Sequence, residues 1–323
     1  MAVPAATQQT YATVGDREDL SNLIFNISPT ETPFTSMAAR TKVKNTFHEW
    51  QTDALDAAAT NAQIEGDDAA NKTVSPTVRL RNYTQILAKT VSVTESQQAA
   101  DHAGVADELD YQVSKRSKEL KRDLEFAAVR NQDSTAGAAA SARQMASVES
   151  WLATNKTSAA QNNAGATTPG YSGGTVAAPT DGTTAGTLVE GMLKNVIQLV
   201  YTAGGDPRTL MVGPATKVKV SGFAGIATQY QQAEGKQATI VSGADTYISN
   251  FGRHTILPNR FMRDRNILVL DMDYWAMGEF RPFQSRGLAK TGDADRKQIV
   301  GEYTLVSRNE LASGKVSDIN PAF

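Results

Sequence analysis

The sequence predicts an α+β protein, and three observations predict it. One long amphipathic helix spans about residues 105–131, and a series of short strand-like runs fills the C-terminal half. Helices and strands do not alternate regularly, as they would in a doubly wound parallel sheet. Of the 323 residues, 40% are hydrophobic and 20% charged, which is ordinary for a folded chain with a buried core.

The composition excludes several classes of function. A net charge of -2 argues against tight non-specific binding to nucleic acid, which needs many lysines and arginines, but leaves weak contact open. The absence of cysteine excludes disulfides, thiolate metal sites and a cysteine nucleophile. Residues 1–11 do not resemble a signal peptide, and no run of about 18 apolar residues occurs. We therefore expect no membrane span, and assembly in the cytoplasm.

The N-terminal region predicts an arm without a core of its own. Residues 1–15 are small and polar, and Asp16 then caps a short helix whose Leu20, Leu23, Ile24 and Ile27 share one face. Pro29 ends this helix, and we expect an extended chain from there through Phe34. The apolar face of the helix has no local partner, so a neighbouring molecule should cover it.

Two strand-like stretches, 41–50 and 77–93, predict a long hairpin. The Ala- and Asp-rich stretch 53–70 between them predicts a polar, mobile tip. An isolated two-stranded ribbon is marginally stable in water. We therefore expect this hairpin to lie on a neighbouring molecule.

The helix at 105–131 should be the longest element. Its length is on the order of 40 Å, and one face holds Val105, Leu109, Val113, Leu120 and Leu124. Residues 157–186 are rich in Ala, Thr, Gly, Asn and Ser, which predicts a long flexible loop or insertion. A short helix around Trp151 should precede it.

A second folded segment begins near residue 187. We expect helices at 187–201 and 214–221 with a buried strand at 209–212 between them. Further strand-like runs follow at Ala238–Val241, Thr246–Ser249, Arg253–Leu257, Asn266–Leu270, Tyr274–Phe280 and Gln298–Ser307.

Three stretches carry a resemblance to a known family: 22–34 (NLIFNISPTETPF), 147–155 (SVESWLATN) and the tail from Asn266 to Ile319. Together with the order of arm, hairpin, long helix and compact domain, they resemble the Hong Kong 97-type major capsid protein of tailed phages. More narrowly, the chain is similar to the major head proteins typified by phage SU-ten.

The resemblance implies a division of the chain. It comprises an N-terminal arm (1–40), an extended hairpin or E-loop (41–90), a P domain with spine helix and flexible insertion (91–186), an A domain (187–271), P-domain return strands (272–309) and a C-terminal A-domain segment (310–323).

The resemblance also implies the function. A subunit of this family forms hexamers and pentamers that close into an icosahedral shell around double-stranded DNA, without catalysis or cofactor. The expected partners are other copies of the chain, a portal, scaffolding or decoration proteins, and weakly the packaged DNA. No long helical domain precedes residue 16, so we expect any scaffold to be a separate chain. The expected location is the virion, after assembly in the host cytoplasm.

We expect seven apolar residues to make intersubunit contacts. They are Leu23, Ile24, Phe25 and Phe34 in the arm, and Phe47, Trp50 and Leu80 in the hairpin.

A catalytic alternative rests on Gly170-Tyr-Ser-Gly-Gly174, which fits the nucleophile-elbow pattern around Ser172. An elbow needs a buried strand before it and a helix after it, and both flanks here are loop-like. Only His254 lies downstream as a triad base. We interpret the pattern as a chance match, and a hydrolase remains the third hypothesis after another lattice- or tube-forming structural protein.

Other site patterns are weak. His48, His102 and His254 lack metal-ligand spacing, and Asp271 with Asp273 is read as a strand-end cap, with a divalent ion as the alternative. Gly235-Lys236-Gln237 is not a phosphate loop.

Lys42, Lys44 and Lys72 are candidates for covalent cross-linking, but no acidic activator is recognisable. The spine cations, Lys115, Arg116, Lys118, Lys121 and Arg122, are balanced by acidic neighbours, which favours a solvated or intersubunit face over DNA contact.

Overall fold

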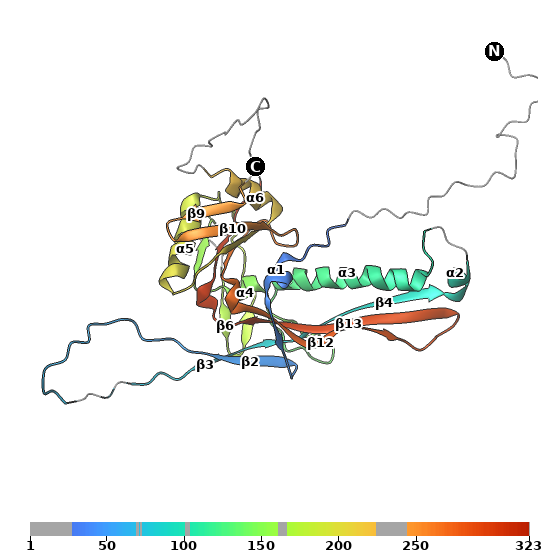
Figure 1. The fold of residues 1–323 in the computed structure, drawn as a ribbon, viewed down its shortest axis with the longest axis horizontal. Coiled ribbons are helices and arrows are strands. Elements are labelled where there is room, and N and C mark those ends of the chain that lie inside the picture. Colours follow the sequence, from blue (N-terminus) through green and yellow to red (C-terminus); the bar gives the residue numbers. More distant parts are fainter. Residues whose placement is uncertain are drawn as a thin grey trace, which may run out of the picture.

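The computed structural model describes residues 28–68, 71, 73–100, 104–160, 167–223 and 244–322. Two lobes lie side by side, a rounded one built on a six-stranded sheet and an elongated one built on a long helix and a four-stranded sheet (Figure 1). From the lower part of the molecule a two-stranded hairpin projects beyond both lobes. Helices and strands are thus mixed without regular alternation, as predicted.

The elongated lobe is a sheet with a helix laid along it. Its strands, in the order β1-β12-β13-β4, are β1 (Ala39–Lys42), β12 (Trp275–Gly287), β13 (Ala294–Ser307) and β4 (Gln85–Thr94). The helix α3 (Glu108–Val129) runs along β4 and β13, and its 22 residues span about 33 Å (Figure 1). Asp107 caps it by accepting from the Asp110 amide, and Leu109, Leu120 and Leu124 are buried on the predicted face.

The rounded lobe contains a six-stranded mixed sheet. Its order is β5-β14-β11-β8-β10-β9, with β5 (Lys156–Ser158), β14 (Gly314–Ser317), β11 (Ile267–Leu270), β8 (Thr209–Val212), β10 (Gly252–Pro258) and β9 (Thr246–Ser249). The helices α5 (Glu190–Thr202) and α6 (Pro214–Ser221) contact β14 and β10 respectively. All residues of β8 and β11 are buried, which identifies them as the centre of the sheet.

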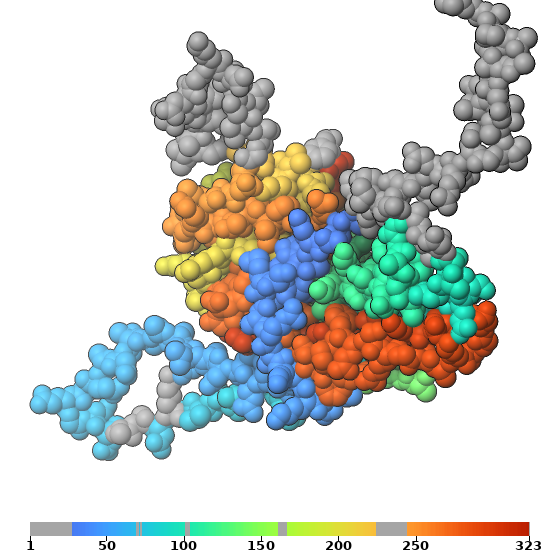
Figure 2. Space-filling view, turned by 45° about the vertical axis from the view of Figure 1, so that its right-hand side comes forward, coloured from blue at the N-terminus to red at the C-terminus, as the bar shows by residue number. Residues whose placement is uncertain are grey.

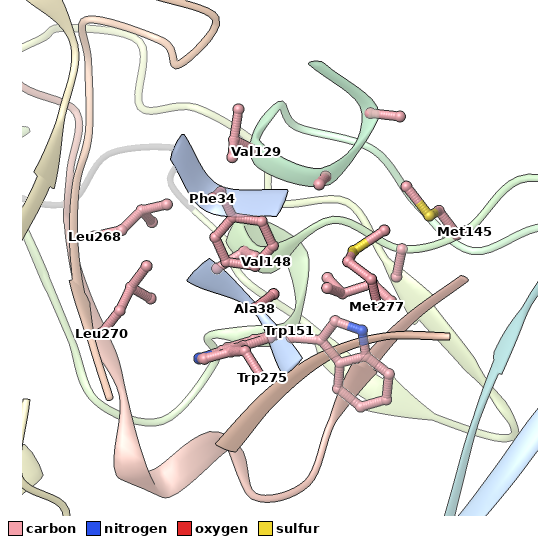
Figure 3. Close-up of a cluster of buried hydrophobic side chains, with 14 of the residues drawn as sticks. Phe34, Ala38, Val129, Met145, Val148, Trp151, Leu268, Leu270, Trp275 and Met277 are labelled. Atoms are coloured by element: carbon pink, nitrogen blue, oxygen red, sulfur yellow. The ribbon is translucent and has the colours of Figure 1, made fainter. Parts of the chain in front are cut away.

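Two hydrophobic clusters share this sheet. Because successive side chains of a strand point to opposite faces, Leu268 and Leu270 join one cluster while Ile267 and Val269 join the other. The first cluster extends into the elongated lobe through Phe34, Trp151 and Trp275, and the second is covered by α5. Figure 3 shows Leu268 and Leu270 facing Phe34 across the first cluster.

The remaining elements are short. They are α1 (Pro33–Met37), α2 (Glu95–Ala99), α4 (Val148–Trp151), the 3-10 turns Met272–Tyr274 and Glu310–Ala312, and the hairpins β2 (Phe47–Thr52) with β3 (Val78–Tyr83) and β6 (Gly170–Ser172) with β7 (Thr175–Ala177).

The structure corrects three expectations. Residues 33–37 form the helix α1 rather than extended chain, because Glu125 accepts hydrogen bonds from the Phe34 and Thr35 amides at 2.9 and 2.8 Å and caps the helix from a distance. The run 77–93 is two strands, since β4 leaves the hairpin and pairs with β13. In the described part of the stretch 157–186, the strands β6 and β7 pack on the rest of the subunit and Val176 is fully buried, so this stretch is not a loose loop throughout.

The expected helix at 16–27 and the expected strand at 238–241 lie outside the described residues. The helices predicted at 105–131, 145–152, 187–201 and 214–221 are confirmed as α3, α4, α5 and α6, with ends that differ by a few residues.

Candidate assembly surfaces

The most exposed feature is the loop at the end of the β2–β3 hairpin. The two strands pair from Phe47 opposite Tyr83 to Thr52 opposite Val78, and every described residue from 53 to 77 is exposed. Three of its apolar side chains lie almost entirely in solvent: Leu55 at 99%, Ile64 at 79% and Val74 at 87% exposure. Figure 2 shows the loop standing clear of the rest of the molecule. Structureless loops of this length are uncommon in compact domains unless they are functional.

The base of the hairpin, in contrast, is fixed by buried polar contacts. The Asn82 side chain donates to the Leu305 carbonyl at 2.7 Å and accepts from the Ala146 amide at 2.9 Å, and it is fully buried. Two residues later, the Thr84 hydroxyl donates to Glu302 at 2.6 Å. Strand β3 is therefore anchored to β13 at the point where the hairpin begins.

Glu302 is the centre of this anchor. Its carboxylate is almost fully buried and receives Arg143 at 2.6 Å on one oxygen and Arg281 at 2.8 Å on the other. Arg143 also donates to the Thr84 carbonyl at 3.3 Å. A buried carboxylate with two guanidinium partners keeps its charge compensated, and removing it would leave the cations unpaired.

The three predicted hairpin residues are brought close to the base of the hairpin rather than to its tip. Trp50 and Leu80 lie opposite each other and pack, half-buried, against the first hydrophobic cluster of the chain itself. Phe47 packs edge-on against Tyr83, with ring centroids 6.4 Å apart. These residues therefore keep only part of their surface for another molecule.

Phe34 does not lie on an assembly surface in this structure. Its ring is 0% exposed and packs edge-on against Trp275 at 6.2 Å, deep in the first cluster (Figure 3). The helix α1 carries it there, so its assignment to an intersubunit contact is corrected to a core role. Leu23, Ile24 and Phe25 lie outside the described residues.

A second exposed apolar surface lies at the edge of the rounded lobe. Strand β9 is the last strand of the six-stranded sheet, and its Ile248 is 72% exposed. Tyr201 near the end of α5 is 57% exposed and contacts Phe251, with ring centroids 4.9 Å apart. An edge strand beside exposed apolar side chains is a surface suited to association.

The geometry around Ser172 does not suit a nucleophile. Ser172 ends β6 in a tight hairpin, and β7 follows rather than a helix. His254 is buried, with its ring nitrogens against Ser249 at 2.7 Å and the Pro207 carbonyl, and burial lowers its pKa. The two residues are therefore parts of separate structural contacts.

The other candidate sites also have structural roles. Asp271 accepts from the amides of Asp273 and Asp206, each at 3.2 Å, which is the capping role expected for it. Within the described ranges no group of three His, Asp or Glu side chains is placed to hold a metal ion. No described helix is long and apolar enough to cross a membrane.

The lysines considered for cross-linking and DNA contact are dispersed. Lys42 and Lys44 are exposed near the base of the hairpin, and Lys72 lies outside the described residues. On α3, Lys115, Lys118 and Lys121 are exposed, whereas Arg116 pairs with Glu119 at 2.7 Å and Arg122 lies over the Phe261 ring. His102 and the 235–237 segment also lie outside the described residues.

The family comparison matches nearly the entire chain. Residues 6–320 match the model of the SU10 major capsid protein family. The chain belongs to this family. It is also 29% identical to the major capsid protein of Escherichia phage Phieco32, over 94% of each chain.

Solved structures agree with this membership. The capsid of a native GTA particle matches with a TM-score of 0.65 at 12% identity, over 98% of this chain and all of that one. The capsid of cyanophage A-1(L) matches with a TM-score of 0.65 at 11% identity, over 96% of this chain and 98% of that one. At such identities the likeness shows the fold, and this major capsid protein has the Hong Kong 97-type fold expected from its sequence.

Membership makes the protein a structural component of the virion and not an enzyme. The polar anchor at Glu302 was not predicted, because the partners Arg143 and Arg281 are far apart in the chain and carry no local pattern. The β6–β7 hairpin was not predicted either, although Gly173-Gly174 between Tyr171-Ser172 and Thr175-Val176 is a turn signal between strand-forming residues.

Proposed function

We propose that this major capsid protein assembles into hexamers and pentamers of a closed icosahedral shell around double-stranded DNA, with the tip of the β2–β3 hairpin lying on a neighbouring subunit. In this proposal residues 1–40 act as arm, 41–90 as E-loop, 91–186 and 272–309 as P domain, and 187–271 with 310–323 as A domain. Strand β4 pairs with β13, so the E-loop in the strict sense is the β2–β3 hairpin and its loop.

The observation that carries the proposal is the exposure of Leu55, Ile64 and Val74 on a loop anchored at a rigid base. Burial of apolar surface contributes about 25 cal/mol per Å². Three nearly fully exposed aliphatic side chains on one loop therefore favour a surface that covers them. Another copy of the chain is the partner that a self-assembling shell supplies.

Further partners follow from the same role. We propose that the shell also contacts a portal and scaffolding or decoration proteins, and that assembly takes place in the host cytoplasm. Contact with DNA would be weak, since the chain has 32 Lys and Arg against 34 Asp and Glu.

The test replaces the three apolar side chains of the tip. In the triple variant Leu55→Ser, Ile64→Ser, Val74→Ser, we expect a folded subunit that no longer closes shells, because the loop loses its apolar contacts while the core is untouched. Circular dichroism checks the fold, and negative-stain electron microscopy with sedimentation measures the yield of closed particles.

A matched control changes polar residues of the same loop. The variant Asn61→Ser, Gln63→Ser, Glu65→Gln should assemble as the wild type does, since these side chains bury no apolar surface. Normal shells from the apolar triple variant would contradict the proposal. Open sheets or tubes from the wild-type protein would favour the alternative of a lattice- or tube-forming protein.

A further inference from the structure

A small hairpin from the insertion between α3 and α5 lies against the base of the extended hairpin. Its strands β6 and β7 are joined by Gly173 and Gly174, whose φ angles of 57° and 90° fit the two-residue turn that hairpins favour. The turn faces β3, and the strands rise beside α4 (Figure 1). The insertion therefore contacts the base of the extended β2–β3 hairpin through its own small hairpin.

The small hairpin is itself held firmly. Val176 is fully buried, its amide donates to the Ser134 hydroxyl at 2.6 Å, and its carbonyl accepts from the Ser134 amide at 2.8 Å. Gly170 lies so close to Ala153 that a Cβ at this position would come within 2.5 Å of the alanine methyl group. The side of β6–β7 away from the extended hairpin is thus part of the core.

Its other side bonds directly to β3. Arg81 donates from Nε to the Gly174 carbonyl at 2.7 Å, and the Tyr171 hydroxyl donates to the Arg79 carbonyl at 3.2 Å. The Arg81 guanidinium also fills the space that a side chain at Gly174 would need, since a Cβ there would lie 2.0 Å from Nη2. Two hydrogen bonds and a close fit therefore join the hairpins.

A row of three aromatic rings completes the joint. Trp50 of β2 lies 5.5 Å from Trp151 of α4, and Trp151 stacks on Tyr171 of β6 at 5.8 Å with an interplanar angle of 7°. These centroid separations are typical of favourable aromatic pairs. Each ring comes from a different element, so the row links the extended hairpin to the core and to the insertion.

We propose that β6–β7 and Trp151 form a brace that fixes the direction in which the β2–β3 hairpin leaves the subunit, with Tyr171 and Arg81 as positioning residues for the intersubunit contact. A two-stranded ribbon is marginal alone, and its six-residue strands extend about 20 Å before the loop begins. A small rotation at the base thus becomes a large displacement of the tip. The inference rests on the proposed docking of the tip and adds that the brace sets where the tip lands, and so the curvature of the shell.

The test compares Tyr171→Ala with Tyr171→Phe in the full chain. In the alanine variant we expect amide exchange at 47–52 and 78–83 to become about tenfold faster in the unassembled subunit, with exchange in β8 and β11 unchanged. We also expect particles of mixed diameter by electron microscopy. The phenylalanine variant keeps the ring stack and should recover a uniform diameter. Ser172→Ala, exposed in the same hairpin, is the control and should match the wild type.

Uniform shells of wild-type diameter from Tyr171→Ala would overturn the brace. If that variant does not fold, Arg81→Met tests the same joint, because it keeps the aliphatic stem and loses the guanidinium with its bond to Gly174 and its contact with the Tyr83 ring. Uniform shells from Arg81→Met would then overturn the proposal. Failure of the docking proposal is recognised separately, since the apolar tip variant would assemble normally whatever the brace variants do.

Discussion

At the scale of single residues, the least usual group is the lysine at the centre of β14. Lys315 is fully buried, and its amine donates to the Glu149 carbonyl at 2.8 Å. Burial lowers the pKa of Lys315 to about 8, and burial likewise raises the pKa of the Glu149 carboxyl, which pairs with Arg263 at 2.9 Å. The cost of burying these charges ties the stability of the rounded lobe to pH.

Lys315→Met should remove the rise in the free energy of unfolding that the titration of Lys315 causes. Between pH 8 and the ordinary lysine pKa of 10.5, the unfolded chain binds the Lys315 proton while the folded chain has released it. The free energy of unfolding therefore rises with pH in this window, by on the order of 3 kcal/mol. Denaturant titrations of both proteins at pH 7–10.5 measure the difference. Exposed Lys115→Met should keep the wild-type slope, and equal slopes in Lys315→Met would contradict the prediction.

At the scale of elements, the buried carboxylate of Glu302 on β13 binds Arg143, Arg281 and Thr84, and so links segments that are far apart in the sequence. We expect Glu302→Gln to lower the free energy of unfolding by about 3 kcal/mol, since Arg143 and Arg281 lose the charge that compensates them. Urea unfolding measures the change. Glu95→Gln, which breaks an exposed pair with Lys290, serves as the control and should cost much less than Glu302→Gln. Similar losses in the two variants would show that the anchor contributes little.

The elements also differ in how far the sequence predicts them. The face of α3 could be predicted from Leu109, Leu120 and Leu124, because a helix of this length carries its own periodic signal. That β4 leaves the hairpin could not be predicted, since its partner β13 lies some 200 residues away and pairing across such a distance leaves no local pattern. The flexible insertion was predicted wrongly for a related reason. Its small polar residues are typical of a loose loop, and the stacking of Tyr171 on Trp151 that holds it is a contact without a local sequence signal.

The candidate assembly site divides in the same way. An exposed hairpin tip could be predicted from the Ala- and Asp-rich stretch after residue 53, which has few large apolar side chains to offer a core. The prediction for Phe34 was wrong because the local sequence, a large aromatic residue after two prolines, is the same for an intersubunit contact and for a core position. The position of Phe34 depends on Glu125, a residue remote in the sequence that caps α1.

At the scale of the whole molecule, the two lobes share a structural centre. Strand β11 sends Leu268 into the cluster that fills the elongated lobe and Ile267 into the cluster under α5, and both side chains are 0% exposed. Strand β8 divides its residues in the same way, with Met211 on one side and Leu210 on the other. Both clusters pack on the same six-stranded sheet, so unfolding of the sheet would expose both of them to water. We therefore expect the subunit to unfold as one unit despite its elongated shape.

This coupling predicts that a cavity on either face of β11 destabilises both lobes of the subunit. Leu268→Ala and Ile267→Ala should each lower the free energy of unfolding by about 2–5 kcal/mol, because each leaves a cavity in a fully packed cluster. Both variants should show one calorimetric transition, and amide exchange should accelerate together in β13 and α5. Val218→Ala, at a 56% exposed position on α6, should change stability by less than about 0.5 kcal/mol. Separate transitions, or exchange that accelerates in only one lobe, would show that the lobes fold independently and that β11 does not couple them.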